Sequence, residues 1–312
     1  MVNKRKLISV LGGNGFLGSY LVNSLLSKGY YVKVISRSAN VSRKNFITFK
    51  PGQCSLINCD IKNYKELQSL LAGSDYVINL VGLLVSKKNN SFYDIHCLAL
   101  KNLVKVCKKL NILKLVHVSA IGANKKSKSD YAKTKYIGEE EVQKYNQYCI
   151  LRPSIIVGDE DNFINFFAKT AKLSPFLPLI GGGKTLFQPI WVQDVVAIII
   201  KVLESNIHSK ILEIGGEEVF SFKDILELIL DELQIKRKLI QIPFSISKQM
   251  AFFLERLPKS LLTRDQVELL KTDNIIKSEN DYRKYINHRP LPLRKILKKQ
   301  LSFMGGKGGH LD

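Results

Sequence analysis

Seven residues near the start of the chain, Gly12-Gly13-Asn14-Gly15-Phe16-Leu17-Gly18, carry glycines at a spacing of three. A short aliphatic run over residues 6–11 precedes them, and apolar residues at helical spacing follow over residues 16–28. At such a strand-to-helix junction Gly12 permits a tight turn, Gly15 lets backbone amides approach a pyrophosphate, and Gly18 lets the helix press on the sheet. The helix N-terminus then attracts the anion. The loop therefore predicts a dinucleotide site, where the alternative is a turn without a ligand.

The end of the next expected strand, residues 31–36, indicates which dinucleotide binds. A site for NADH usually has an acid there that accepts from the ribose hydroxyl, whereas this sequence continues with Arg37, followed by Arg43 and Lys44. Arginine grips a phosphate through its charge and its forked donors. We therefore predict NADPH, with NADH as the alternative if Arg37 is only one more basic residue in a basic chain.

Asp60 and Ile61 follow a third expected strand near residues 56–59. At the carboxyl edge of a parallel sheet, this position meets the adenine of a dinucleotide. An aspartate there is equally an ordinary N-cap or turn residue. The sequence leaves both roles of Asp60 open.

A tyrosine and a lysine, Tyr131 and Lys135, lie one helical turn apart in a helix expected over residues 131–145, and so share a face. An ammonium in that geometry favours the deprotonated phenol and orients the nicotinamide ribose, so the phenol can act as a general acid or base in hydride transfer. The inference that this pair is catalytic depends on its position in the helix after the strand expected at residues 113–118, and not on the spacing alone. Ser119 ends the preceding strand, where its hydroxyl could polarise a substrate carbonyl. We take Ser119, Tyr131 and Lys135 as the candidate catalytic residues.

Strands and helices alternate over the first half of the chain, which predicts a parallel sheet covered by helices on both faces. Further strands are expected at residues 76–81, 113–118 and 149–152, and further helices at 64–71 and 93–110. The alternation loosens after residue 152, where prolines and glycines cluster between residues 175 and 183 and amphipathic helices follow, as over 222–233. We predict an α/β fold with a Rossmann-type doubly wound parallel sheet and a smaller, mainly helical C-terminal lobe. Residues 1–150 would form the NAD(P)-binding domain, 151–303 the remaining sheet and the lobe, and 304–312 a flexible tail.

The composition excludes several classes of protein. The 312 residues are 45% hydrophobic and 24% charged, and the longest aliphatic run, residues 195–200, is far too short for a membrane span. Five scattered cysteines without a CxxC pair and five isolated histidines suggest a reducing compartment and no metal site. The glycines interrupt the first apolar run before it reaches signal-peptide length, so we take the start as mature protein.

The net charge of +21 admits two interpretations. Lysines are spread through the whole chain and do not alternate with aromatics, which argues against a specific nucleic-acid partner. The charge is then either a solvated surface or an attraction to a phosphate-rich surface such as an anionic bilayer. Residues 247–257 also form a dense apolar helix face flanked by cations, for which core burial is the simpler expectation and docking on a partner or bilayer the alternative.

Several motifs together resemble an atypical extended short-chain dehydrogenase. They are the glycine loop, Arg37, Asn79-Leu80-Val81-Gly82, Val118-Ser119-Ala120-Ile121-Gly122-Ala123, the Tyr131/Lys135 pair and Arg152-Pro153-Ser154. A narrower likeness lies in residues 262–274, Leu-Thr-Arg-Asp-Gln-Val-Glu-Leu-Leu-Lys-Thr-Asp-Asn, which are similar to the bacterial relatives of the nucleotide-binding accessory subunit of respiratory complex I. An amphipathic helix packed on its own domain would give the same apolar spacing in that segment.

The resemblance implies a Rossmann fold that holds NADPH tightly, in a protein beside the quinone-reducing arm and not known for turnover. It implies cofactor contacts by the following residues: Gly12, Gly13, Asn14, Gly15, Phe16, Leu17, Gly18, Arg37, Asp60, Ile61, Val81, Gly82, Tyr131, Lys135 and Pro153. One departure weakens epimerase chemistry, because Ser119 is followed by Ala120 and Ile121 and not by further hydroxyl residues.

Three functions therefore remain open. The first is an accessory or assembly component of complex I with bound NADPH. The second is a soluble NAD(P)-dependent oxidoreductase or epimerase on a small substrate, and the third is a peripheral membrane protein of ubiquinone metabolism. A cytoplasmic location, peripheral on the inner face of the plasma membrane, fits the first and third.

Overall fold

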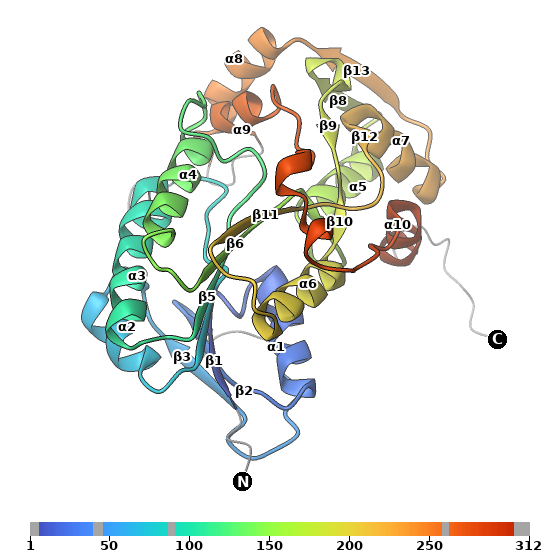
Figure 1. The fold of residues 1–312 in the computed structure, drawn as a ribbon. Coiled ribbons are helices and arrows are strands. Elements are labelled where there is room, and N and C mark those ends of the chain that lie inside the picture. Colours follow the sequence, from blue (N-terminus) through green and yellow to red (C-terminus); the bar gives the residue numbers. More distant parts are fainter. Residues whose placement is uncertain (1–5, 40–45, 87–90, 258–261, 303–312) are drawn as a thin grey trace, which may run out of the picture. The chain divides into compact units, whose positions relative to one another are not determined.

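The computed structural model describes residues 6–39, 46–86, 91–257 and 262–302, and its contacts divide the chain into two compact units (Figure 1). Unit 1 comprises Met1–Pro153, Val195–Glu213 and Glu279–His288, and unit 2 comprises Ser154–Asp194, Ile214–Ser278 and Arg289–Asp312. The chain thus leaves unit 1 and returns to it twice, whereas our division at residue 150 treats each part as continuous. The expected tail 304–312 lies outside the described residues, as do Arg43 and Lys44.

Unit 1 is built on a seven-stranded sheet, and the expected parallel Rossmann-type architecture is confirmed (Figure 1). The strands are β1 (Leu7–Leu11), β2 (Tyr31–Ser36), β3 (Cys54–Asn58), β4 (Tyr76–Asn79), β5 (Lys114–Val118), β6 (Tyr148–Pro153) and β11 (Lys210–Ile214). Their order is β11-β6-β5-β4-β1-β2-β3, and β1 to β6 pair in parallel. The order reverses between β1 and β4, which is the point at which such sheets bind ligands beyond the carboxyl ends of the strands.

Helices cover both faces of this sheet, which explains why the central strands β4 and β5 are buried along their whole length. The helices are α1 (Phe16–Ser27), α2 (Tyr64–Leu71), α3 (Ala99–Lys109), α4 (Asp130–Val142) and α6 (Val192–Glu204). On one face, Leu67 of α2, Leu103 of α3 and Val142 of α4 share a buried core with strand residues such as Leu115. On the other face Glu204, at the end of α6, accepts a hydrogen bond from Tyr30 (3.0 Å) just beyond α1.

The helix expected over residues 93–110 is interrupted near its start. Residues Asp94–Leu98 form a π-helical turn, and α3 follows directly at Ala99. The turn packs closely on α4, because a side chain at Gly138 would collide with the carbonyl oxygen of His96. A π turn inside a helix often marks a functional site.

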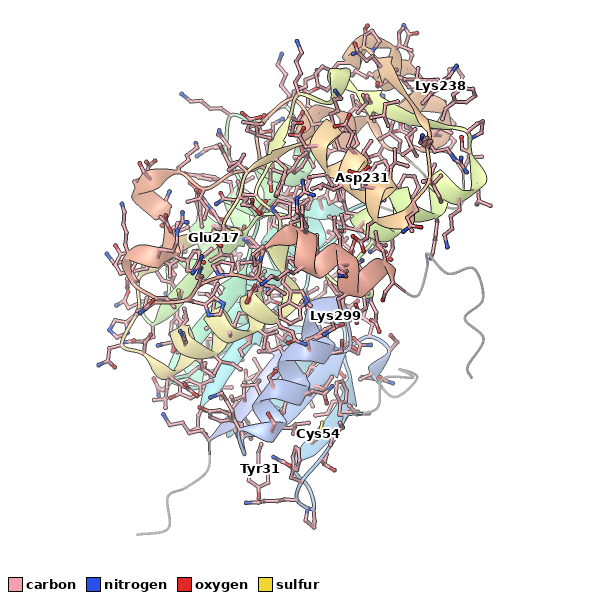
Figure 2. All side chains as sticks on the ribbon, turned by 90° about the vertical axis from the view of Figure 1, so that its right-hand side faces the viewer. Tyr31, Cys54, Glu217, Asp231, Lys238 and Lys299 are labelled. Carbon is pink, nitrogen blue, oxygen red and sulfur yellow. The ribbon has the colours of Figure 1, made fainter. Side chains whose placement is uncertain are left out.

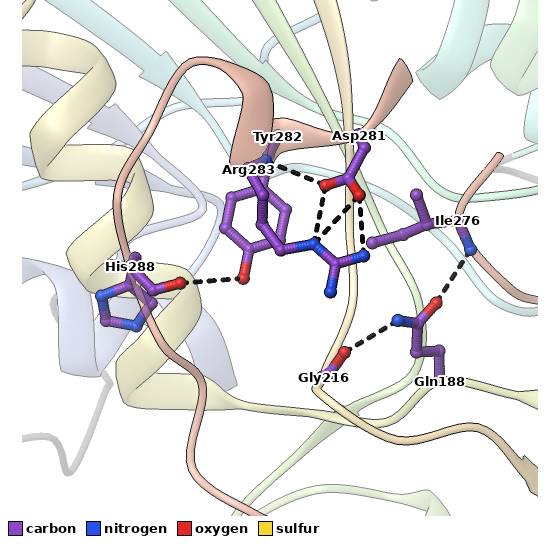
Figure 3. Close-up of polar contacts among 7 residues, drawn as sticks. All are labelled: Gln188, Gly216, Ile276, Asp281, Tyr282, Arg283 and His288. Atoms are coloured by element: carbon purple, nitrogen blue, oxygen red, sulfur yellow. Dashed lines mark hydrogen bonds and ion pairs between the residues drawn. The ribbon is translucent and has the colours of Figure 1, made fainter. Parts of the chain in front are cut away.

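Unit 1 also takes in the late segment Glu279–His288. Tyr282 is fully buried there, Asp281 forms a β-bridge with Glu213, and the Arg283 guanidinium donates to both carboxylate oxygens of Asp281 (Figure 3). These contacts fix a segment distant in sequence beside β11.

Unit 2 combines short strand pairs with helices. Its elements are β7 (Ile156–Val157), α5 (Phe163–Leu173), β8 (Phe176–Ile180), β9 (Leu186–Phe187), β10 (Ile190–Trp191), β12 (Phe220–Ser221), α7 (Phe222–Leu233), β13 (Lys238–Ile242), α8 (Phe244–Leu254), α9 (Arg264–Leu269) and α10 (Leu293–Leu301). Phe163, Phe167 and Phe222 pack edge to face or tilted in its core. The Gln188 amide joins two loops of this unit, since it donates to the Gly216 carbonyl and accepts from the Ile276 amide (Figure 3).

No described helix has both the length and the apolar character that a membrane span requires. The described residues likewise contain no group of three or more His, Cys, Asp or Glu side chains that could hold a metal ion.

Candidate dinucleotide site

The glycine loop joins β1 to α1 through a closed turn. Gly12 has a φ of +79°, its amide donates to the Ile35 carbonyl (2.8 Å), and its carbonyl accepts from the Gly15 amide (3.0 Å). A side chain at Gly18 would overlap the Gly12 carbonyl and lie 2.6 Å from the Gly13 Cα. Glycine is thus required at position 12 by conformation and at position 18 by the close approach of helix and loop.

The N-terminus of α1 is open to an anion. Gly15 is its N-cap and supplies no side-chain acceptor, and the first turn holds no acidic residue. Among the described residues, a Cβ at Gly15 would have a single neighbour within 4 Å, the Gly12 carbonyl oxygen at 3.3 Å, so no other described atom occupies the space beside this position. Uncapped amides, the helix dipole and free space together fit a pyrophosphate.

The loop after β4 lies directly against the glycine loop, across the point where the strand order reverses. An added Cβ at Gly12 would lie 3.3 Å from both the amide nitrogen and the Cγ2 of Val81. One at Gly82 would lie 3.2 Å from the Lys135 Nζ. The structure therefore brings Val81 and Gly82 close to Lys135, which lies more than 50 residues further along the sequence.

Arg37 lies in the turn that follows β2, with its side chain exposed. The Asn14 amide of the glycine loop donates to the carbonyl of the neighbouring Ser38 at 3.5 Å, which places this turn beside the loop. An exposed guanidinium at this position is available to a phosphate on a bound nucleotide.

Asp60 makes the contacts of a turn aspartate. Its carboxylate accepts from the Lys62 amide (3.0 Å) and pairs with the Lys62 ammonium (3.4 Å), while Asn63 caps α2. The neighbouring Ile61 is buried in the core of unit 1. The adenine contact that we expect of both residues stays a prediction.

Lys135 is buried beneath the end of β5. Its Nζ donates to the Val118 carbonyl (3.3 Å) and lies 6.0 Å from the centre of the Tyr131 ring. Burial lowers the pKa of this ammonium to about 8, and the nearby Glu139 offsets part of the effect. A hydrogen-bond acceptor such as a ribose hydroxyl would stabilise the charged form.

Ser119 lies directly after Val118 and is 4% exposed. Its Oγ is buried, and no hydrogen bond to it is found among the described residues. Buried hydroxyls are almost always paired, and a water molecule or a ligand atom would supply the partner of this one.

A histidine that the sequence analysis missed, His96, holds this region in place. Its Nε2 accepts from the Leu83 amide (3.1 Å), and its Nδ1 lies 3.0 Å from the Thr134 hydroxyl. Phe92 stacks on the imidazole, and the Tyr131 ring meets it edge on. Burial, and secondarily the Lys135 charge, lowers the pKa of His96 to about 3, so the ring is neutral.

Asn79, which belongs to a motif quoted above, lies on β4 beside His117 of β5, a histidine that the sequence analysis did not single out. Asn79 Nδ2 is 3.1 Å from His117 Nδ1, and Asn79 Oδ1 accepts from the Val81 amide (3.2 Å). Burial holds the pKa of His117 well below its usual range, and its Nε2 is another buried atom for which the described residues provide no hydrogen bond. Alternation along β5 puts His117 and Ser119 on one face, a signal that the sequence did carry.

A buried ion cluster anchors α4 to the sheet. Arg152 of β6 donates through Nε to Glu139 (3.0 Å) on α4, and its NH1 lies 3.4 Å from Glu213 on β11. At the end of the same strand, the Pro153 carbonyl accepts from the Ile121 amide (3.0 Å) in the loop after Ser119. These contacts position the helix that carries Tyr131 and Lys135.

This fold and this glycine loop define a class of dinucleotide-binding proteins, and the comparison with known families agrees. A model of the NAD dependent epimerase/dehydratase family matches residues 8–215, and the chain belongs to this family. Among curated proteins it is 32% identical to the NADH dehydrogenase [ubiquinone] 1 alpha subcomplex subunit 9, mitochondrial, of Arabidopsis thaliana, over 86% of this chain and 70% of the relative.

Other relatives extend this picture. The NADH-ubiquinone oxidoreductase 40 kDa subunit, mitochondrial, of Neurospora crassa is 27% identical over 87% of this chain and 72% of its own length. Human sterol-4-alpha-carboxylate 3-dehydrogenase, decarboxylating, is 26% identical over 78% of this chain and 70% of its own. The dTDP-glucose 4,6-dehydratase of Bacillus anthracis, solved with NAD, shares the fold at a TM-score of 0.74, 17% identity and 96% coverage of both chains. The expected resemblance to complex I accessory subunits and the NAD-binding fold are thereby confirmed.

Proposed function

We propose that this chain is an accessory or assembly component of NADH:ubiquinone oxidoreductase (complex I) that holds NADPH as a fixed cofactor. The likeness to named complex I subunits carries the proposal. It spans 86% of the chain in the Arabidopsis relative, so it extends past residue 215, where the family match ends. The match to sterol-4-alpha-carboxylate 3-dehydrogenase also extends past residue 215, so the higher identity and coverage of the Arabidopsis complex I subunit favour the proposal.

The described residues suggest how the cofactor would be held. The pyrophosphate would lie on the loop Gly12-Gly13-Asn14-Gly15 and on the first residues of α1, Phe16 and Leu17, with Gly18 behind them. Asp60 and Ile61 would border the adenine, Tyr131 and Lys135 would bind the nicotinamide ribose, and Val81, Gly82 and Pro153 would line the strand ends near the ring. When bound, the nicotinamide can accept or give a hydride.

The preference for NADPH rests on the turn after β2. Arg37 is exposed beside the glycine loop, and residues 31–39 contain no carboxylate that could accept from a ribose 2′-hydroxyl. Arg37→Ala should weaken the binding of NADPH about ten- to a hundredfold, because one charge-assisted contact contributes roughly 1.5–3 kcal/mol. The binding of NADH should be nearly unchanged. Calorimetric titration of both nucleotides measures this, with Lys28→Ala at the other end of α1 as the control for net charge. Equal losses for the two nucleotides would contradict the preference.

The fixed role is tested in cells. In a deletion strain that carries each variant, Gly15→Val should impair complex I activity in membranes, because the side chain fills the pyrophosphate space. Tyr131→Phe should be mild, since it removes one ribose hydrogen bond, on the order of 1 kcal/mol. Normal complex I in the complete deletion would defeat the proposal.

A second candidate is a soluble NAD(P)-dependent oxidoreductase or epimerase. The buried Ser119 hydroxyl, one residue beyond the Val118 carbonyl that Lys135 contacts, favours it, because a substrate carbonyl could be polarised there. For this candidate, Tyr131→Phe should retain NADPH and lose ~10²-fold or more of the turnover. Nucleotide that stays bound through purification supports the fixed cofactor, and multiple turnovers support the enzyme.

The location that we propose is cytoplasmic and peripheral on the membrane that carries complex I. The two complex I relatives above are named as mitochondrial, so they lend no support to the inner face of a plasma membrane in particular. Fractionation of cells, followed by detection of the chain in membrane and soluble fractions at low and high salt, tests this placement. A peripheral protein of ubiquinone metabolism would fractionate in the same way. The two functions differ in the deletion strain, where loss of a protein of ubiquinone metabolism would leave complex I activity normal.

A further inference from the structure

Two places in the molecule reverse the usual distribution of apolar and charged side chains. On helix α8 of unit 2, Ile246, Met250 and Phe253 are 49%, 43% and 69% exposed. The small Ser247 and Ala251 face the unit instead, so the core burial that we expected for this helix face is wrong. In unit 1 four charged side chains are buried or nearly buried where α4 meets the sheet: Lys135, Glu139, Arg152 and Glu213.

The four buried charges balance one another. Other charged side chains are exposed to solvent, and Figure 2 labels four of them: Glu217, Asp231, Lys238 and Lys299. In the buried cluster, the Arg152 Nε donates to Glu139 (3.0 Å), and its NH1 lies 3.4 Å from Glu213. One guanidinium between two carboxylates leaves one negative charge over, and the Lys135 ammonium balances it. An uncompensated charge in a protein interior is costly, so the lysine and the excess carboxylate support each other.

Glu139 is the carboxylate that is placed to act on Lys135. The two residues lie four positions apart on α4, hence on one face of the helix, and they are 0% and 4% exposed. The lysine Nζ donates to the Val118 carbonyl and lies 6.0 Å from the centre of the Tyr131 ring, so Glu139 acts on it through its charge and not through a direct ion pair. Burial lowers the pKa of Lys135 to about 8, and the Glu139 charge raises it.

The titratable groups on the elements packed against α4 supply no other counter-charge to Lys135 among the described residues. His96 and Cys97 come from the π turn, and His117 comes from β5. Burial is the main cause that lowers the pKa of His96 to about 3 and that of His117 well below its usual range, so both rings are neutral. Burial also raises the pKa of the Cys97 thiol to about 11. Arg152, from β6, carries a charge of the same sign as the lysine.

We propose that Glu139 is a positioning residue of the dinucleotide site, which keeps Lys135 charged and so available to the ribose of a bound nucleotide above neutral pH. The inference rests on the dinucleotide binding proposed above. The Val118 carbonyl takes one of the three donors of the ammonium, and the others remain for ribose hydroxyls. A lysine that loses its proton forms weaker bonds, because hydrogen bonds from a charged donor are about twice as strong as neutral ones.

Calorimetric titration of NADPH between pH 6 and 9 tests the proposal, with Glu213→Gln as the matched control for Glu139→Gln. Each variant removes one carboxylate from Arg152 and leaves an amide oxygen that can accept from it. Relative to the parent, Glu139→Gln should bind equally near pH 6 and about three- to tenfold more weakly near pH 8. Glu213→Gln should differ from the parent by the same factor at every pH. Comparison at each pH cancels the titration of the nucleotide's own phosphate.

Two further measurements separate charge from packing. Glu139→Asp keeps the charge on a shorter side chain and should follow the pH profile of the parent. In urea unfolding without nucleotide at pH 7, Glu139→Gln should raise the unfolding equilibrium constant about three- to tenfold more in the parent than in Lys135→Met. At pH 10, where the folded lysine is neutral, the two effects should be equal.

The outcomes distinguish this proposal from the proposed function. A parent that binds no NADPH defeats the proposed function, and unfolding without nucleotide then still decides whether Glu139 supports the charge of Lys135. Parallel pH profiles of Glu139→Gln and Glu213→Gln overturn the proposal. So does an alkaline loss in Glu139→Asp as large as in Glu139→Gln, or an equal effect of Glu139→Gln in the parent and in Lys135→Met at pH 7.

Discussion

Removal of the buried ammonium at position 135 should stabilise the protein in the absence of nucleotide. The pKa of Lys135 falls from 10.5 to about 8 on folding. When the lysine is protonated in both the folded and the unfolded state, this shift lowers the free energy of unfolding by about 3 kcal/mol. Lys135→Met keeps a similar volume and gives up the bond to the Val118 carbonyl, which contributes about 1 kcal/mol. We therefore expect the variant to be about 2 kcal/mol more stable at pH 7.

The pH dependence follows from the same shift. Below pH 8 both states carry the proton and the full cost applies. Between pH 8 and 10.5 the unfolded chain binds more protons than the folded one, so the parent gains stability as the pH rises. The advantage of Lys135→Met should therefore shrink through this window, reach zero between about pH 9.5 and 10, where the remaining cost equals the roughly 1 kcal/mol hydrogen bond, and reverse above it.

Urea unfolding followed by circular dichroism at pH 7, 8, 9 and 10 measures both effects. Lys133→Met, on the same helix, is the control: Lys133 is half-exposed and pairs with Asp130 at 3.7 Å, so its loss should change stability by less than about 1 kcal/mol at every pH. A Lys135→Met variant that is less stable than the parent at pH 7, or whose advantage is constant with pH, refutes the reasoning. The same variant should bind NADPH more weakly.

Three further substitutions test other parts of unit 1. Gly18→Ala should lower the free energy of unfolding by about 1–3 kcal/mol, because its Cβ overlaps the glycine loop, whereas Gly15→Ala should change it little; comparable losses in urea unfolding would contradict the close packing. His96→Gln should flatten the loss of stability between pH 6.5 and 3, since the parent's folded ring binds its proton only near pH 3 and the unfolded ring near 6.5; parallel pH profiles would exclude this. Arg152→Met should cost about 3–5 kcal/mol at pH 7, because Glu139 and Glu213 stay buried without their cation, and a thermal melt like that of the parent would show that the cluster is not needed.

The sequence predicted the central sheet of unit 1 closely, because its strands are short runs rich in aliphatic residues that alternate with helical patterns. Residues 31–36 and 64–71 coincide with β2 and α2. The edge strand β11 was not foreseen, since Lys210–Ile214 joins β6 through a pairing that local pattern does not reveal. The π turn at Asp94–Leu98 was missed for a related reason: the apolar spacing continues through it unchanged.

The candidate site was predicted where the backbone needs a particular residue and missed where a side chain acts through tertiary contacts. Gly12 and Gly18 show themselves by type and spacing, and the structure gives a physical reason for each. His96 has no such signature, because its role comes from Leu83, Thr134 and Tyr131 around it. The orientation of α8 was mispredicted because hydrophobicity along the chain does not say which face of a helix meets the protein.

The interleaving of the two units has a consequence for biosynthesis. The outer edge of β6 is complete at Pro153, but β11, which pairs with it, ends at Ile214. At about 5–20 residues per second, the ribosome needs roughly 3–12 s to make the intervening chain. During that interval an apolar strand edge stays open to other nascent chains. The last segment of unit 1 ends only at His288, so the chain of the nucleotide-binding unit is complete only near the end of translation, after most of unit 2 has been made.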